Sequence, residues 1–135
     1  MFEFEGEIFG KPINKEQLLS RWEKMSGKSG FLHTGHYLIS IDNSKCDLKS
    51  ISLNKYLEGV VTTKIDFMCL SNSEILKYAL TSEPYNCAGG FAIEGYGGLF
   101  IKKIDGCFSN VIGLSLPWLK TNIEQLGLSA LLLDR

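Results

Sequence analysis

An alternation of apolar and acidic residues predicts the first strands of the chain. Residues 2–9 read Phe-Glu-Phe-Glu-Gly-Glu-Ile-Phe, which has the two-residue period of a strand and is interrupted at Gly6. This pattern predicts a β-hairpin turned at the glycine. Two longer β-rich segments, Phe31–Ile41 and Val60–Met68, predict further strands, and the polar start of residues 42–59 predicts a loop between them.

Three further segments have the apolar spacing and the end signals of helices. The predicted cap and start signals are Asn14 with Gln17, Ser71 with Glu74, and Pro117. The predicted glycine stops are Gly27 and Gly127. The predicted apolar faces are Leu18, Leu19, Trp22 and Met25 in the first helix, Ile75, Leu76, Ala79 and Leu80 in the second, and Leu119, Ile123 and Leu126 in the third.

The segment between the second and third helices has strand-like stretches. Residues 99–104 and 108–112 predict a β-hairpin turned at Asp105-Gly106, and the apolar tail 128–135 is expected to pack on the body or on a partner. Strands and helices mix without strict βαβ alternation. We therefore expect an α/β protein, with a mixed sheet and packed helices in a single domain over residues 1–135.

A cluster of glycines follows the second helix. Five of the eleven residues from Ala88 to Gly98 are glycine, and between them stand the apolar triplet 91–93 and one carboxylate, Glu94. Glycine costs conformational entropy, so such a cluster requires either positive φ angles or a close approach to the backbone. Two interpretations fit: a pair of tight turns around a short buried strand, or a glycine-lined wall for a flat polar ligand.

Composition narrows the classes of function. Hydrophobic residues make up 44% and charged residues 21%, with a formal net charge of −1, so the basic face of a nucleic-acid-binding protein is not expected. No apolar run approaches the length of a membrane span, so we expect no membrane partner. The chain opens directly into the predicted hairpin without a signal peptide, and we expect a cytoplasmic protein with reduced thiols. The cysteines are Cys46, Cys69, Cys87 and Cys107.

The two histidines do not predict a metal site. His33 and His36 are three residues apart in a predicted strand, where side chains alternate between the two faces. We therefore expect them to point in opposite directions, and we assign no metal ligand. The cysteines contain no Cys-x-x-Cys pair, so a zinc knuckle is not expected either.

The glycine-rich stretch and its surroundings carry a resemblance. The motifs are Glu-Pro, Ala-Gly with an aromatic residue, Ile-Glu-Gly, Gly-Leu-Phe, an Ile-x-Gly turn and Asn-Val-x-Gly-Leu. Their positions are Glu83, Pro84, Ala88, Gly89, Phe91, Ile93, Glu94, Gly95, Gly98, Leu99, Phe100, Ile104, Gly106, Asn110, Val111, Gly113 and Leu114. With Gly10-Lys11-Pro12, Ser26-Gly27-Lys28 and Thr34-Gly35 before them, they closely resemble the Maf family of septum-formation-inhibitor-like nucleoside triphosphate pyrophosphatases.

The resemblance implies a fold and an activity. It implies a Maf/ITPase-like mixed sheet, of which residues 1–135 would be the C-terminal two-thirds. It also implies hydrolysis of a nucleoside or deoxynucleoside triphosphate, with a pyrimidine or modified base, to the monophosphate and pyrophosphate. A divalent metal, Mg2+ or Mn2+, and a homodimer are further implications of the family.

The resemblance also assigns site residues. Lys11 matches the Gly-Lys-Pro lysine and would act as a catalytic partner of phosphate or carboxylate. Glu94, with the neighbouring Gly95, matches the position linked to base recognition or site organisation, and Thr34 belongs to the matching Thr-Gly strand. Without the family, Lys11 reads as a solvated loop lysine and Glu94 as the cap of a turn.

Two family motifs have no match here. The Ser-x-Ser-x-Arg-Arg phosphate loop and the catalytic Asp-Thr pair would fall upstream of Met1, so we expect an N-terminally truncated member of the family. The alternative function is then a catalytically impaired remnant that binds nucleotide or dimerises. Such a remnant should have an open groove holding Lys11 and Glu94, and uncovered apolar sheet surface near Phe2, Phe4 and Ile8.

Overall fold

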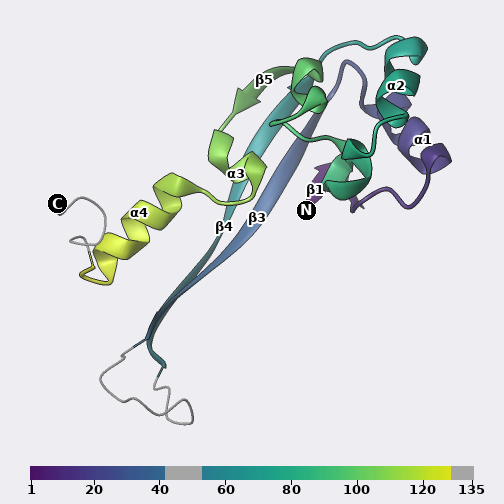
Figure 1. The fold of residues 1–135 in the computed structure, drawn as a ribbon. Coiled ribbons are helices and arrows are strands. Elements are labelled where there is room, and N and C mark those ends of the chain that lie inside the picture. Colours follow the sequence, from purple (N-terminus) through teal and green to yellow (C-terminus); the bar gives the residue numbers. More distant parts are fainter. Residues whose placement is uncertain (42–52, 129–135) are drawn as a thin grey trace.

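A single antiparallel sheet forms the framework of the molecule (Figure 1). The structure is a computed structural model that describes residues 1–41 and 53–128. Five strands are ordered β2-β1-β3-β4-β5. Their bounds are Phe2–Phe4 for β1, Glu7–Phe9 for β2, Ser29–Ile41 for β3, Leu53–Phe67 for β4 and Ile101–Asp105 for β5.

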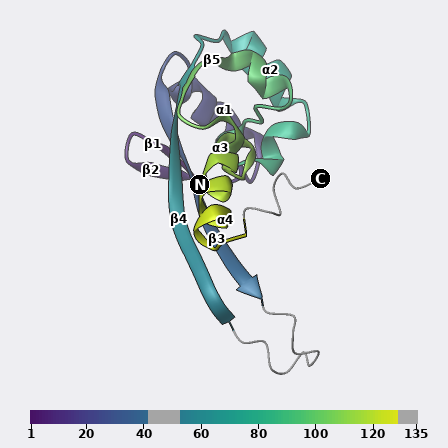
Figure 2. The same cartoon turned by 90° about the vertical axis from the view of Figure 1, so that its left-hand side faces the viewer.

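The helices gather on one side of this sheet (Figure 2). Four α-helices and three 3-10 turns are described, and they confirm the predicted α/β class with helices packed on a sheet. The described strand pairs are all antiparallel, so the sheet is not mixed in direction. Their bounds are Lys15–Met25 for α1, Asn72–Ala79 for α2, Phe108–Ile112 for α3, Leu116–Gln125 for α4, Glu83–Asn86 for η1, Ala88–Gly90 for η2 and Tyr96–Phe100 for η3.

Strands β3 and β4 extend well beyond the other strands (Figure 1). They pair from Ser29 and Asp66 at one end to Ile41 and Leu53 at the other. On β3, strand β1 pairs only with residues 31–32, and on β4, strand β5 pairs only with residues 64–67. The body of the protein is therefore built on one end of the long strand pair, and the other end projects from it as a two-stranded arm.

The core lies between the sheet and the helices and is rich in aromatic rings. Trp22 of α1 is fully buried and makes edge-to-face contacts with Phe67 and Tyr78. Phe2 of β1 is also fully buried and lies edge-to-face on Phe91 of the glycine-rich segment. The sheet, α1, α2 and the glycine-rich segment thus share one core.

The predicted helix starts are confirmed. Asn14 caps α1 by accepting a hydrogen bond from the Gln17 N–H at 2.8 Å, although the Gln17 side chain accepts from the Ile13 N–H and not from Asn14. Ser71 and Glu74 form the complete capping box of α2.

Three local predictions are wrong. Residues 108–112 form helix α3 instead of a strand, because a five-residue apolar pattern fits one helical turn as well as a strand. Strand β4 begins at Leu53, so part of the predicted loop is strand. On α2, Leu76 and Leu80 are exposed and Tyr78 faces inward, because the buried positions follow Ile75 at i+3 and i+4.

The expected uncovered sheet surface near the N-terminus is also largely absent from the described structure. Of the three residues named in that prediction, Phe2 and Phe4 are buried in the core and Ile8 is exposed. Residues 42–52 and the predicted tail from 129 lie outside the described residues. Within residues 1–41 and 53–128, no helix has the length and hydropathy that a bilayer crossing requires.

Candidate functional site

A cavity of about 570 Å³ lies between the middle of β3 and the glycine-rich segment. Its volume is within the range typical of small-molecule sites. Strand β3 forms one side, residues 86–94 form a second, and residues 111–113 at the end of α3 form a third. Its lining includes Leu32, Thr34, Cys87, Phe91, Glu94 and Val111.

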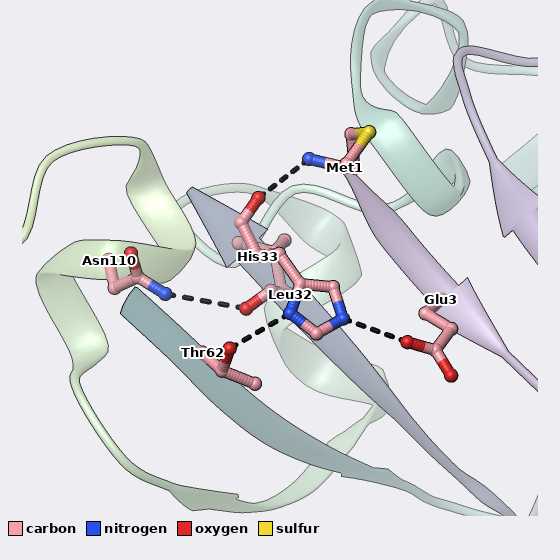
Figure 3. Close-up of polar contacts among 6 residues, drawn as sticks. All are labelled: Met1, Glu3, Leu32, His33, Thr62 and Asn110. Atoms are coloured by element: carbon pink, nitrogen blue, oxygen red, sulfur yellow. Dashed lines mark hydrogen bonds and ion pairs between the residues drawn. The ribbon is translucent and has the colours of Figure 1, made fainter. Parts of the chain in front are cut away.

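The β3 side of the cavity is fixed by hydrogen bonds to α3. The Thr34 hydroxyl donates to the backbone oxygen of Asn110 at 3.1 Å. The buried Asn110 amide in turn donates to the Leu32 oxygen at 3.4 Å and the Val61 oxygen at 3.0 Å, and so connects α3 to both long strands (the Leu32 contact is drawn in Figure 3). Thr34 is therefore held in place before any ligand arrives.

Two of the predicted site residues line this cavity and two do not. Thr34, from strand β3, and Glu94, from the glycine-rich segment, both belong to its lining. Lys11 is exposed in the loop after β2, close enough that its charge, like that of Glu94, acts on the Cys87 thiol. Gly95 lies outside the lining, with its backbone against the Glu83 carboxylate.

The pKa of the Cys87 thiol reflects the charges around the cavity. Burial raises the pKa of Cys87, the carboxylates of Glu94 and Glu83 raise it further, and Lys11 lowers it. The thiol is therefore protonated at neutral pH and is a weak nucleophile. Among the described cysteines, Cys69, Cys87 and Cys107 are free thiols, and Cys46 lies outside the described residues.

The two histidines have separate partners on opposite faces of β3, as their spacing predicts. The His33 ring contacts the Glu3 carboxylate at 3.0 Å and the Thr62 hydroxyl at 2.9 Å (Figure 3). The His36 ring contacts the Thr34 oxygen at 3.0 Å and accepts from the Ser115 N–H at 2.8 Å. Each ring is therefore engaged by hydrogen-bond partners of its own.

Glu83 and Tyr78 hold the segment beside the cavity, although the sequence analysis gave Glu83 only as part of a motif and did not name Tyr78. The Glu83 carboxylate accepts hydrogen bonds from the Tyr78 hydroxyl at 2.7 Å, the Tyr96 N–H at 2.9 Å and the Gly97 N–H at 2.8 Å. A Glu-Pro pair before a glycine cluster signals only a turn. The sequence therefore gives no sign that this carboxylate binds backbone groups more than ten residues away.

These hydrogen bonds determine the protonation states of Glu83 and Tyr78 at neutral pH. Partial burial of Glu83 acts to raise its pKa, but the Tyr78 hydroxyl and the Gly97 and Tyr96 N–H groups outweigh it, so the pKa of Glu83 lies below its usual value of 4.5. Burial, and then the Glu83 carboxylate, raise the pKa of Tyr78. At neutral pH the glutamate is charged and the tyrosine is a hydrogen-bond donor.

Acid should weaken the fold in part through Glu83. Its pKa is lower in the folded state, so the unfolded state binds more protons, and the free energy of unfolding should fall as the pH drops below the usual value of 4.5. Urea unfolding across this pH range should show a shallower decline for Glu83→Gln than for the parent chain. Asp66 and Glu74 also have lowered pKa values but are common to both proteins, so the difference isolates Glu83. Parallel curves would contradict the assignment.

Comparison with known proteins identifies the family. A sequence model described as "Maf-like protein" matches residues 1–126. The chain belongs to the Maf family. This agrees with the resemblance carried by the glycine-rich segment and with the antiparallel sheet and helices of the fold.

Curated relatives of this Maf-family chain are named "Nucleoside triphosphate pyrophosphatase". One from Prochlorococcus marinus strain NATL1A is 80% identical over 135 residues, which is 100% of this chain and 64% of the relative. One from Prochlorococcus marinus strain MIT 9301 is 53% identical over 123 residues, 91% of this chain and 60% of the relative. The chain thus spans less than two-thirds of the length of these relatives.

The described part of this Maf-family chain does not offer a metal site. Among residues 1–41 and 53–128, no group of three or more His, Cys, Asp or Glu residues is arranged to hold a metal ion. Among the described residues that line the cavity, Glu94 is the sole carboxylate. The divalent cation that the family implies does not fit the residues described.

Proposed function

We propose that this chain carries the nucleotide-binding wall of a Maf-type nucleoside triphosphate pyrophosphatase. The reaction is hydrolysis of a nucleoside or deoxynucleoside triphosphate to the monophosphate and pyrophosphate. The observation that carries the proposal is the cavity lined by both Thr34 and Glu94, in a chain of this family. The names of the curated relatives support the same reaction.

The chemistry of the lining favours the base end of the nucleotide. An ionised carboxylate only accepts hydrogen bonds, so Glu94 suits an N–H donor and would repel a phosphate. The ring N–H of uracil or thymine and the amino group of cytosine are such donors, as are the amino group of adenine and the ring N–H and amino group of guanine. The apolar side chains of Leu32, Phe91 and Val111 offer contact surface to a flat ring. A carboxylate accepts from purine and pyrimidine bases alike, so our proposal of a pyrimidine or modified nucleotide as the ligand rests on the resemblance to the Maf family.

A second candidate function is nucleotide binding or dimerisation without turnover, and the small number of carboxylates at the cavity favours it. A general base typically contributes about 10²- to 10⁴-fold to a hydrolytic rate. The family's Asp-Thr acid has no match in the 135-residue chain, and within the described residues the cavity lining holds a single carboxylate. Lys11 could meet the charge of a phosphate but could not activate water.

Calorimetric titration of the 135-residue chain with UTP, dTTP, CTP, ATP and GTP tests the binding function. We expect the pyrimidine nucleotides to bind, and Glu94→Ala to weaken UTP binding by about tenfold or more, because a hydrogen bond to a charged group is lost. Glu23→Ala, an exposed acid on α1, is the matched control and should leave the affinity unchanged. Absence of nucleotide binding would refute the proposed function, and an unchanged affinity in Glu94→Ala would refute the assigned residue.

Pyrophosphate release on the same samples separates the two functions. We expect the isolated chain to release pyrophosphate from UTP at least about 10² times more slowly than the full-length Prochlorococcus marinus NATL1A relative, because no general base is assigned. Comparable rates, abolished by Glu94→Ala, would make Glu94 the base and exclude the binding-only function.

A further inference from the structure

The glycine-rich segment presents Glu94 to the cavity from the tip of a β-turn. The Gly95 N–H donates to the Ala92 oxygen at 3.3 Å, so Ile93 and Glu94 are the two central residues of this turn. Both line the cavity. The direction of the Glu94 carboxylate therefore depends on how the two ends of the turn are held.

The Tyr78–Glu83 pair holds both ends of this turn. At the start of the turn, the Tyr78 hydroxyl accepts a hydrogen bond from the Ala92 N–H at 3.3 Å. Just after its end, the Glu83 carboxylate accepts from the N–H groups of Tyr96 at 2.9 Å and Gly97 at 2.8 Å. The Tyr78 hydroxyl donates to Glu83, which joins the two ends into one hydrogen-bonded unit.

The unit is anchored in the rigid part of the fold. The Tyr78 ring is buried in the core, edge-to-face against Trp22 and Phe100. Glu83 begins η1, where Pro84 is buried and the Tyr85 hydroxyl donates to the Ala79 oxygen at 2.9 Å. Neither acceptor can follow a displaced loop without disturbing α2 or the core.

Gly95 leaves no room for a side chain, because the Glu83 carboxylate lies against its Cα. A Cβ built on Gly95 would lie 2.1 Å from Glu83 Oε2 and 2.5 Å from the carboxylate carbon. Its φ of −120° is open to any residue, so close approach and not backbone freedom requires glycine here. The Glu83 carboxylate therefore lies directly against the turn that carries Glu94.

We propose that Glu83 is a positioning residue, which acts through Tyr78 and the backbone of residues 92–97 to fix the Glu94 carboxylate at the cavity wall. The consequence for binding rests on the proposed nucleotide function, but the structural claim does not. The lowered pKa of Glu83 supports it, because the charged form makes the stronger hydrogen bonds and predominates at neutral pH.

A double-mutant cycle tests whether Glu83 acts through Glu94. We expect Glu83→Ala and Glu94→Ala each to weaken UTP binding by about tenfold. If the two act as a unit, the double variant should bind about as weakly as either single variant, whereas independent effects would multiply to about a hundredfold. Glu83→Gln should lie between, because one amide oxygen can still accept from Tyr78 and Gly97.

Amide hydrogen exchange measures the turn itself without any ligand. In Glu83→Ala, exchange at Gly95, Tyr96 and Gly97 should accelerate by about tenfold or more relative to the core amides of β3 and β4. Glu74→Ala is the matched control, because it removes the capping box of α2 but touches none of these groups. It should lower stability and leave the exchange pattern of the turn and the UTP affinity unchanged.

The outcomes separate the two proposals. Additive effects in the cycle, or exchange at residues 95–97 that follows the core amides, would overturn the positioning role. If the parent chain binds no UTP, the proposed function fails by itself, and the exchange pattern alone then decides the structural claim: local acceleration in Glu83→Ala supports it and unchanged local exchange refutes it.

Discussion

Replacing Trp22 with alanine is expected to lower the free energy of unfolding by about 3–5 kcal/mol. Trp22 is fully buried, and its ring makes edge-to-face contacts with Phe67, Tyr78 and Phe100 at centroid distances of 5.4, 5.8 and 5.6 Å. The indole N–H also donates to the Gly90 oxygen at 2.9 Å, so one side chain connects α1, the sheet and the glycine-rich segment. A loss of this size is a large part of the stability of a typical domain.

Urea unfolding followed by circular dichroism measures the loss in Trp22→Ala. Trp22→Phe should have an intermediate cost, because it keeps a ring in the core but leaves the buried Gly90 oxygen without its donor. Leu80→Ala, at a position that is 72% exposed at the end of α2, is the control and should change stability by no more than about 0.5 kcal/mol. Equal costs for Trp22→Ala and Leu80→Ala would contradict the described core.

The sequence predicted those strands and helix ends that depend on interactions between neighbouring residues. The hairpin at Gly6 and the caps at Asn14 and Ser71 each depend on residues within about five positions, and each is present in the structure. The wrong predictions concern segments whose secondary structure depends on contacts with distant parts of the chain. Residues 108–112 form a helix that is joined to both long strands through the Asn110 amide, and no pattern within five residues can signal those distant contacts.

The glycine cluster combines both interpretations that the sequence left open. Gly89 and Gly90 have φ angles of +76° and +75°, which turn the chain, while Gly95 is required by the close approach of Glu83. Phe91 and Ala92 are buried as the first interpretation expects, although they do not form a strand. The same turns bring Glu94 to the cavity wall, so the tight turns are what build the candidate ligand surface.

The candidate site could be predicted only where a motif marked its residues. Thr34 and Glu94 lie sixty positions apart in the sequence and came from family motifs, and the structure brings them to one cavity. The residues that hold them in place, Glu83 and Asn110, were seen only as parts of a motif. Their roles depend on backbone groups of distant segments, which side-chain patterns do not encode.

Replacing Asn110 with alanine is expected to lower the free energy of unfolding by about 2–4 kcal/mol, since buried hydrogen bonds are lost and a cavity is left. The Asn110 amide is fully buried and donates to the Leu32 oxygen, the Val61 oxygen and the Thr63 hydroxyl. Aspartate should cost more than alanine at this position, because a carboxylate would face these acceptors with no hydrogen to donate when ionised.

The matched control for Asn110 is Asn122→Ala in α4. The Asn122 amide is half-buried and donates to one backbone oxygen, that of Trp118, at 2.7 Å. Its loss should lower the free energy of unfolding, measured by urea unfolding, by about 1 kcal/mol.

The same comparison tests the support of the cavity, because the Asn110 backbone oxygen accepts a hydrogen bond from the Thr34 hydroxyl and residues 111–113 after Asn110 line the cavity. A folded Asn110→Ala protein should therefore bind UTP more weakly than Asn122→Ala does. Equal stability losses, with equal UTP affinities, would show that Asn110 neither joins α3 to the sheet nor supports the cavity, and the Thr34 side of the site would then have to be held by the strands alone.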